Sequence, residues 1–239
     1  MIFKPPDSKY LDVLIADQRA CGELLQSDLG NQCLRRIYCR TNLALVEGGL
    51  SYFKSTTYQF NEGTLRPFAN TLGVMGIELA GPIFCDIVPP EESRLLLDRQ
   101  PCVGNKGKIR DAPRFLDFQT NFRFTFSMVD RVYKIDCSPD YGATPEWKEL
   151  LLGVQTRNRI THPKVGENLD VSDEEIAAIA TGCQWYMDYG GSVFTKIAES
   201  LSKHDEEAGR LGTHVLDAAL RQIKDLVDEI RSVGTEPTE

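Results

Sequence analysis

One short segment combines the residue types that phosphate chemistry needs. Between residues 157 and 163 the chain reads Arg-Asn-Arg-Ile-Thr-His-Pro. Arg157 carries a planar fork of N–H donors that matches the oxygens of a phosphate group, and His162 can accept or donate a proton near neutral pH. Asn158 stands four residues before His162, a spacing that brings two residues to one side of a helix. We therefore take Arg157 and His162 as candidate catalytic residues and Asn158 as a supporting residue.

Pro163 sets the geometry that this segment can adopt. A proline disfavours the helical conformation for the residue before it, so the sequence predicts a helix that ends at His162. On an unbroken helix, residues five positions apart point roughly 140° away from each other, whereas a histidine at the helix end can turn back towards Arg157. The structural alternative is that Arg157 caps the last carbonyl groups and that His162 favours the negative helix end.

Further charged residues could assist such a site. Arg159 and Lys164 are candidates for contacts with the phosphates of a ligand, although solvated surface charge explains them at least as well. The densest basic run contains three further candidates, Lys106, Lys108 and Arg110. A solvated basic loop is the commoner explanation for that run. Glu47, in an apolar helical stretch near Arg36 and Arg40, is expected to form an ion pair or to lie near the site, and the structural role is favoured.

Helix signals surround the motif. Thr144-Pro145-Glu146 is typical of a helix start, with threonine as the cap and proline at the first helical position, and the apolar residues that follow would bind this helix to a core. Ser172 with Glu175 three residues later forms a capping box that opens the next helix, which the Gly190–Gly191 pair could kink or split. Other helices are expected over about 8–27, 34–53, 113–133 and from 205 onward, and a polar loop over 102–112.

Strand signals are almost absent, so the chain reads as an all-α protein built by helix-on-helix packing. Its 239 residues suffice for one large domain. We expect a helical domain over residues 1–203, with a candidate insertion at 58–107. A C-terminal helix over 204–233 is expected to pack on the same domain, and residues 234–239 are expected to be disordered.

Composition excludes several classes of protein. The net charge of −8 disfavours a protein that coats nucleic acid with its whole surface, although it leaves room for a local basic cleft. Seven scattered cysteines without a C-x-x-C pair indicate reduced thiols in the cytoplasm and argue against a zinc site. The first residues lack the apolar region of a secretory signal, and no stretch is apolar enough to span a membrane. We expect neither a metal nor a cofactor.

The motif resembles the R-x4-6-H signature of the HEPN superfamily, in which the arginine is often followed by a polar residue such as asparagine. The string Arg157-Asn158-Arg159-Ile160-Thr161-His162-Pro163 is similar to the common form of that signature. An aromatic-rich helix over 113–133 before it and the helix start at Val171–Ile176 after it also fit the setting. The resemblance covers roughly residues 10–200, and it implies a HEPN-like helical bundle with an insertion and an additional C-terminal helix.

The resemblance also implies a homodimer in which two motif helices meet across a two-fold axis. Many HEPN proteins are metal-independent endoribonucleases, in some cases for defence or toxin-type growth control with an antitoxin partner. His162 would then act as general base or acid, and Arg157 would stabilise charge on the phosphate. Other members are non-catalytic modules that bind a partner protein or a nucleotide. A third hypothesis is an unrelated helical domain in which the motif is accidental.

Overall fold

The computed structural model shows a mostly helical chain, and this confirms the all-α fold class. It describes residues 9–67, 70, 87–103, 108–114, 116–137 and 144–233, and the side chains of 101, 111 and 204–233 lie outside that description. Lys106 and the expected disordered tail therefore lie outside the described residues. The division into domain, insertion and appended helix stays a prediction.

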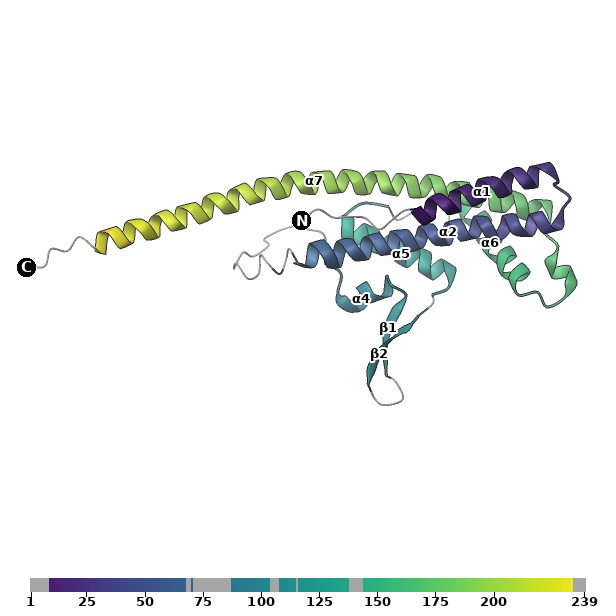
Figure 1. The fold of residues 1–239 in the computed structure, drawn as a ribbon, viewed down its shortest axis with the longest axis horizontal. Coiled ribbons are helices and arrows are strands. Elements are labelled where there is room, and N and C mark those ends of the chain that lie inside the picture. Colours follow the sequence, from purple (N-terminus) through teal and green to yellow (C-terminus); the bar gives the residue numbers. More distant parts are fainter. Residues whose placement is uncertain are drawn as a thin grey trace, which may run out of the picture.

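A hairpin of two helices forms one side of the bundle (Figure 1). Helix α1 spans Lys9–Ser27 and helix α2 spans Gln32–Phe60. Asn31 ends the turn between them and caps α2, because its side-chain oxygen accepts hydrogen bonds from the Cys33 and Leu34 N–H groups at 3.0 and 3.2 Å. Helix α2 continues into one π-helical turn, Asn61–Leu65, and it packs against α1, α5, α6 and α7.

Three further helices complete the core around α2. They are α5 (Phe118–Tyr133), α6 (Pro145–Thr161) and α7 (Asp173–Val233). Each contributes fully buried apolar side chains, among them Phe122, Leu150 and Ile179. The core therefore binds the motif helix α6 on its α2 and α7 sides, as the sequence led us to expect.

Helices α6 and α7 approach each other closely at a glycine. A Cβ atom added to Gly182 of α7 would lie 2.5 Å from both the backbone N and the Cα of Leu150 in α6. Only a residue without a side chain allows this contact, because backbone atoms cannot move aside as the tip of a side chain can. Gly182 therefore fixes the distance between the two helices that carry the motif and the residues that follow it.

The expected polar loop at 102–112 is wrong for residues 102–103 and 109–112, which belong to the two antiparallel strands of a β-hairpin. Strand β1 (Arg99–Val103) pairs with β2 (Ile109–Pro113), with Val103 opposite Ile109. The short helix α4 (Pro90–Leu95) precedes it. At the base of the hairpin, Lys54 of α2 is only 2 % exposed and pairs with Asp98. Short strands rich in charged residues show little alternation of apolar and polar residues, and this explains why the sequence did not predict them.

Two expected helix boundaries also need correction. The aromatic helix begins at Phe118 and not at Pro113, because Pro113 pairs in β2 and Asp117 caps the helix by accepting from the Thr120 N–H at 3.0 Å. The separate helix expected from residue 205 does not exist, since α7 runs unbroken through Gly190, Gly191 and the acidic residues 205–207. These acids lie inside the helix because no residue before them ends it.

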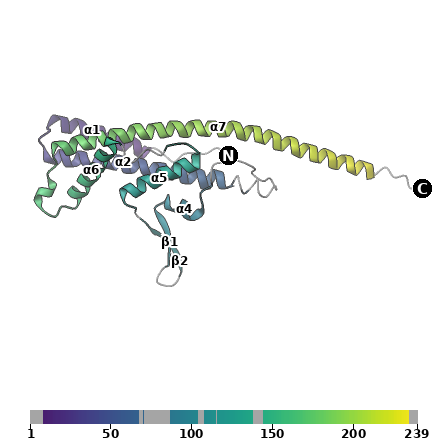
Figure 2. The same ribbon diagram turned by 180° about the vertical axis from the view of Figure 1, so that it is seen from behind.

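Helix α7 extends far past the other elements, and both views show its C-terminal half projecting beyond the bundle (Figures 1 and 2). Within the described part of the chain, no helix is both long and apolar enough to cross a membrane.

Candidate functional site

Helix α6 ends as its sequence predicts. Its last residue is Thr161, and His162 follows as the C-cap with φ −125° and ψ 60°, outside the helical region. The His162 N–H still donates to the Asn158 carbonyl at 3.0 Å, and the Thr161 hydroxyl donates to the Arg157 carbonyl at 2.7 Å. The helix therefore ends directly before Pro163, with His162 as its C-cap, and this confirms the predicted boundary.

Arg157 forms an ion pair with Glu47 of the central helix α2. The Arg157 side chain is 26 % exposed and that of Glu47 is 45 % exposed, so the pair lies at the edge of the bundle. The Arg157 Nε is buried, and no described residue accepts a hydrogen bond from it. The Arg157 Nε–H therefore lacks an acceptor among the described residues, a state that normally costs about 1–3 kcal/mol for a buried donor.

Arg159, two residues later, points its donors into the loop after α6. Its Nη1 donates to the carbonyl groups of Asn168 and Asp170, both at 2.7 Å. Its Nη2 donates to both carboxylate oxygens of Glu175, at 2.6 and 2.7 Å. Arg159 therefore cross-links the end of α6, the loop and the start of α7, and this structural use leaves it poorly placed to contact RNA.

Glu175 combines its helix-capping role with this ion pair. The predicted capping box is confirmed, since the Ser172 N–H donates to Glu175 at 3.0 Å and the Glu175 N–H donates to the Ser172 hydroxyl at 3.2 Å. The Thr156 hydroxyl of α6 donates to the same carboxylate at 2.8 Å. Burial raises the pKa of Glu175, but hydrogen bonds from Ser172, Arg159 and Thr156 outweigh this effect, and the pKa lies below its usual value of 4.5.

His162 and its neighbours lie on the surface. The side chains of Asn158, His162 and Lys164 are exposed. Among the described residues, none forms a hydrogen bond with the His162 imidazole. Arg157, Asn158 and His162 thus share one helix end, and the imidazole is open to a ligand. The structure does not join Arg157 to His162 by a direct hydrogen bond.

Helix α2 supplies a third arginine to this helix end, after Arg157 and Arg159. Arg40 Nη2 donates to the Ile160 carbonyl of α6 at 2.9 Å. Arg40 and Glu47 stand seven residues apart, so they lie on one side of α2, and each contacts α6 within its last turns. Sequence reasoning noted Arg40 only as a neighbour of Glu47. In the sequence, the signal for both contacts was an arginine and an acid seven residues apart in an apolar helical stretch.

The other basic candidates lie elsewhere. Lys108 and Arg110 are exposed residues of the β-hairpin, which Figure 1 shows apart from the end of α6 that carries His162. The structure therefore does not bring this basic run to the motif. Within the described ranges, no three His, Cys, Asp or Glu side chains are grouped so that they could hold a metal ion.

The cysteines next to the core are not reactive groups. Cys39 and Cys183 are buried, and burial raises the pKa of each thiol to about 12. The thiols stay protonated at neutral pH, whereas nucleophilic cysteines have a lowered pKa. For these two residues the structure agrees with the expectation of small core side chains.

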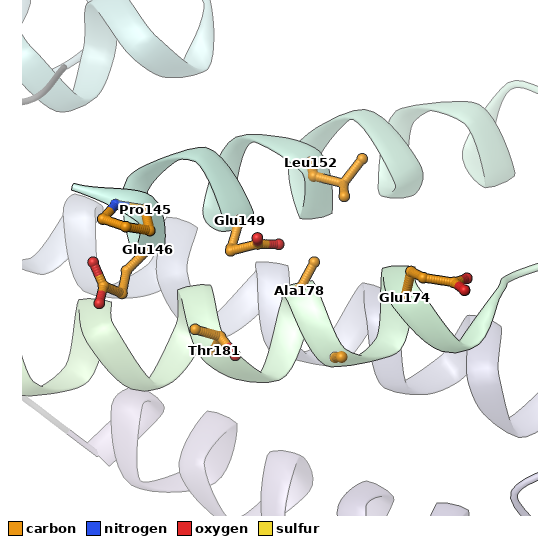
Figure 3. Close-up of a pocket in the computed structure, with 8 residues that line it drawn as sticks. Pro145, Glu146, Glu149, Leu152, Glu174, Ala178 and Thr181 are labelled. Atoms are coloured by element: carbon orange, nitrogen blue, oxygen red, sulfur yellow. The ribbon is translucent and has the colours of Figure 1, made fainter. Parts of the chain in front are cut away.

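The opposite end of α6 forms a groove with α7 (Figure 3). Its volume is about 470 Å³. Glu146 and Glu149 extend from α6 towards α7, and Glu174 lies across from Leu152 at one end. The rest of the lining is small or apolar and consists of Pro145, Ala177, Ala178 and Thr181. Sequence reasoning assigned no role to this end of the helix beyond the helix start.

We compared the chain with models of protein families, with curated proteins and with solved structures, and none of them matches.

Proposed function

We propose that this protein is a HEPN-like, metal-independent endoribonuclease whose site is the C-terminal end of α6. The single observation that carries the proposal is the exposed His162 at a helix end shared with the partly exposed Arg157, whose Nε–H has no acceptor among the described residues. A phosphate oxygen near Arg157 would accept hydrogen bonds in the fork geometry that arginine offers. We further propose that the protein acts in the cytoplasm, in defence or toxin-type growth control.

The proposed reaction is an internal transesterification of RNA. The ribose 2′-oxygen attacks the adjacent phosphorus, the bond from phosphorus to the 5′-oxygen breaks, and the products are a 2′,3′-cyclic phosphate and a 5′-hydroxyl. One imidazole takes the proton from the 2′-hydroxyl, and a protonated imidazole gives one to the leaving 5′-oxygen. A homodimer with two motif helices facing one groove would supply both, with His162 of each copy in one role.

Glu47 and Asn158 have supporting roles in this proposal. Glu47 accepts from one Arg157 nitrogen and so limits the directions in which the guanidinium group can point. Substrate phosphate would share Arg157 with Glu47 or displace it. Asn158 lies one turn before His162 on the exposed side of the helix, where its amide can hydrogen-bond to the imidazole or to a ribose.

Cleavage of a mixed-sequence RNA in the presence of EDTA tests the proposal. The full chain is expected to produce cyclic phosphate ends, and His162→Ala and Arg157→Ala are each expected to lower the rate at least ~100-fold, the size of a typical acid–base contribution. His214→Ala is the matched control, because it removes a histidine outside the motif. RNA with 2′-deoxyribose at the cleaved positions must resist cleavage. Equal rates for wild type and both variants, or no cleavage by wild type, would contradict the proposal.

A non-catalytic module is the second candidate function. Its support is the ion pair between Arg157 and Glu47, because a residue already paired within its own fold does not need a substrate. Such a module would bind a partner protein, such as an antitoxin, or a nucleotide through the same helix end. Glu47→Gln separates phosphate binding from binding of a partner protein: it frees Arg157 and is expected to raise the affinity for RNA if the site binds phosphate, and to leave it unchanged if the site binds a protein. The cleavage assay in EDTA then separates a nuclease from a module that binds a nucleotide.

A further inference from the structure

We propose that the β1–β2 hairpin of one copy of this protein docks into the α6–α7 groove of a second copy. The groove is the hollow lined by Pro145, Glu146, Glu149, Leu152, Glu174, Ala177, Ala178 and Thr181. The contact lies away from the Arg157–His162 helix end, so it does not depend on the proposed nuclease activity.

The hairpin carries an apolar pair that its own chain leaves in water. Val103 is 73 % exposed and Ile109 is 76 % exposed. The two residues are register partners, so their side chains lie on the same face of the ribbon. Both views show the hairpin pointing away from the bundle (Figures 1 and 2). An exposed two-stranded hairpin is marginally stable by itself, and its apolar pair therefore favours a protein surface as partner.

The charges of the hairpin and of the groove are opposite. Lys108 and Arg110 are exposed next to Ile109, whereas the groove carries Glu146, Glu149 and Glu174 (Figure 3). Among the residues that the structure describes, no lysine or arginine forms a salt bridge with these three carboxylates. Complementary charges of this kind orient two surfaces and raise the rate at which they meet.

The two faces of the hairpin also match the two walls of the groove. Successive residues of a strand point to opposite faces, so Ile109 lies on one face and Arg110 on the other. The α7 side of the groove includes Ala177 and Ala178, and the α6 side carries Glu146 and Glu149. Because the two helices touch at Gly182 and Leu150, the hairpin lies over the groove and does not pass between them. In that position Ile109 can face the alanines while the basic residues reach the glutamates, and a groove of about 470 Å³ takes side chains of the hairpin.

The same hairpin cannot fill the groove of its own chain. Figures 1 and 2 show the hairpin on the α4 side of the bundle, apart from the α6–α7 pair. The hairpin base is also fixed, because the buried Lys54 pairs with Asp98 and donates to Asn121 at 3.0 Å. A second copy is therefore the occupant that brings both surfaces together. If each copy inserts its hairpin into the other, the contact repeats and closes a dimer.

Sedimentation of the full chain over a range of concentrations tests the proposal. Wild type is expected to self-associate, and the association is expected to weaken as salt rises. The groove-reversed variant Glu146→Lys/Glu149→Lys and the hairpin-reversed variant Lys108→Glu/Arg110→Glu are each expected to weaken it at least ~10-fold. Combining all four substitutions in one chain is expected to restore it. Glu23→Lys and Lys148→Glu, at exposed positions outside the groove, are the matched controls and should change nothing.

Circular dichroism of each variant checks that the helices remain. A chain that is monomeric at every concentration would overturn the proposal, and so would self-association that both charge reversals leave unchanged. Loss of RNA binding without loss of self-association in the hairpin-reversed variant would assign the hairpin to RNA and also overturn it. His162→Ala is expected to self-associate like wild type, so failure of the nuclease proposal and failure of this one give different results.

Discussion

The two ends of α6 use their charges in opposite ways. At the C-terminal end, Arg157 and Arg159 are joined to acids of other helices, and Arg40 donates to a carbonyl of the last turn. At the N-terminal end, Glu146 and Glu149 border an open groove and form no salt bridge among the described contacts. Paired charges fix the position of a helix end, whereas unpaired ones remain available to a partner. One helix therefore has an end held in place by ion pairs and an end whose carboxylates remain open to solvent.

The largest expected effect comes from the close contact between α6 and α7 at Leu150 and Gly182. Gly182→Ala places a methyl group against the Leu150 backbone, and we expect it to lower the free energy of unfolding by about 1–3 kcal/mol, the usual result of overpacking. Gly191→Ala is the matched control: its Cβ meets nothing within 4 Å, and removing a helix glycine stabilises by up to about 1 kcal/mol. Urea denaturation measures both. Equal effects would show that the close approach of α6 and α7 is not needed.

Arg159→Ala should distinguish the two ends of the helix. It removes the donor of two loop carbonyls and one of the donors to the Glu175 carboxylate, so we expect a loss of about 1–2 kcal/mol, allowing for partial exposure. Glu149→Ala, at the open end, should change stability by less than about 0.5 kcal/mol. Hydrogen exchange would locate the Arg159 effect in residues 166–172. A larger effect for Glu149→Ala than for Arg159→Ala would reverse the comparison.

The smallest expected effect is a dependence of folding stability on pH. Because the folded state lowers the pKa of Glu175, the stability from this group is fully present above its usual pKa of 4.5 and is lost as pH falls through the lower folded value. We expect Glu175→Gln to be less stable than wild type at neutral pH. The gap between them should narrow when urea titrations are repeated below about pH 4. An unchanged gap across that range would remove Glu175 as the cause.

Local signals in the sequence predicted the helix boundaries around the site. Pro163 and the Ser172–Glu175 capping box act within one helical turn, and both have the predicted result. The contacts of Arg157 and Arg159 could not be predicted in the same way. Glu47 stands 110 positions from Arg157 along the chain, and only the packing of α2 against α6 brings the two together.

The β-hairpin and the unbroken α7 were missed for a related reason. The two strands owe their form to pairing with each other and to the buried Lys54–Asp98 ion pair at their base, and neither leaves a periodic pattern. In α7 the acids at 205–207 resemble a helix start, but the helix simply continues through them. The prediction took these acids as the start of a new helix, although no residue before them signals the end of the previous one.

The aromatic side chains between α5, α6 and α7 make the molecule easy to follow in solution. Trp147 and Trp185 are the two tryptophans of the chain, and their ring centres lie 6.0 Å apart. Phe122 lies 4.8 Å from Trp147, and Tyr189 stacks 5.5 Å from Trp185. Tryptophan fluorescence will therefore report on this one junction, because both tryptophans lie in it. Emission that shifts before the loss of helical circular dichroism would mean that the junction opens first.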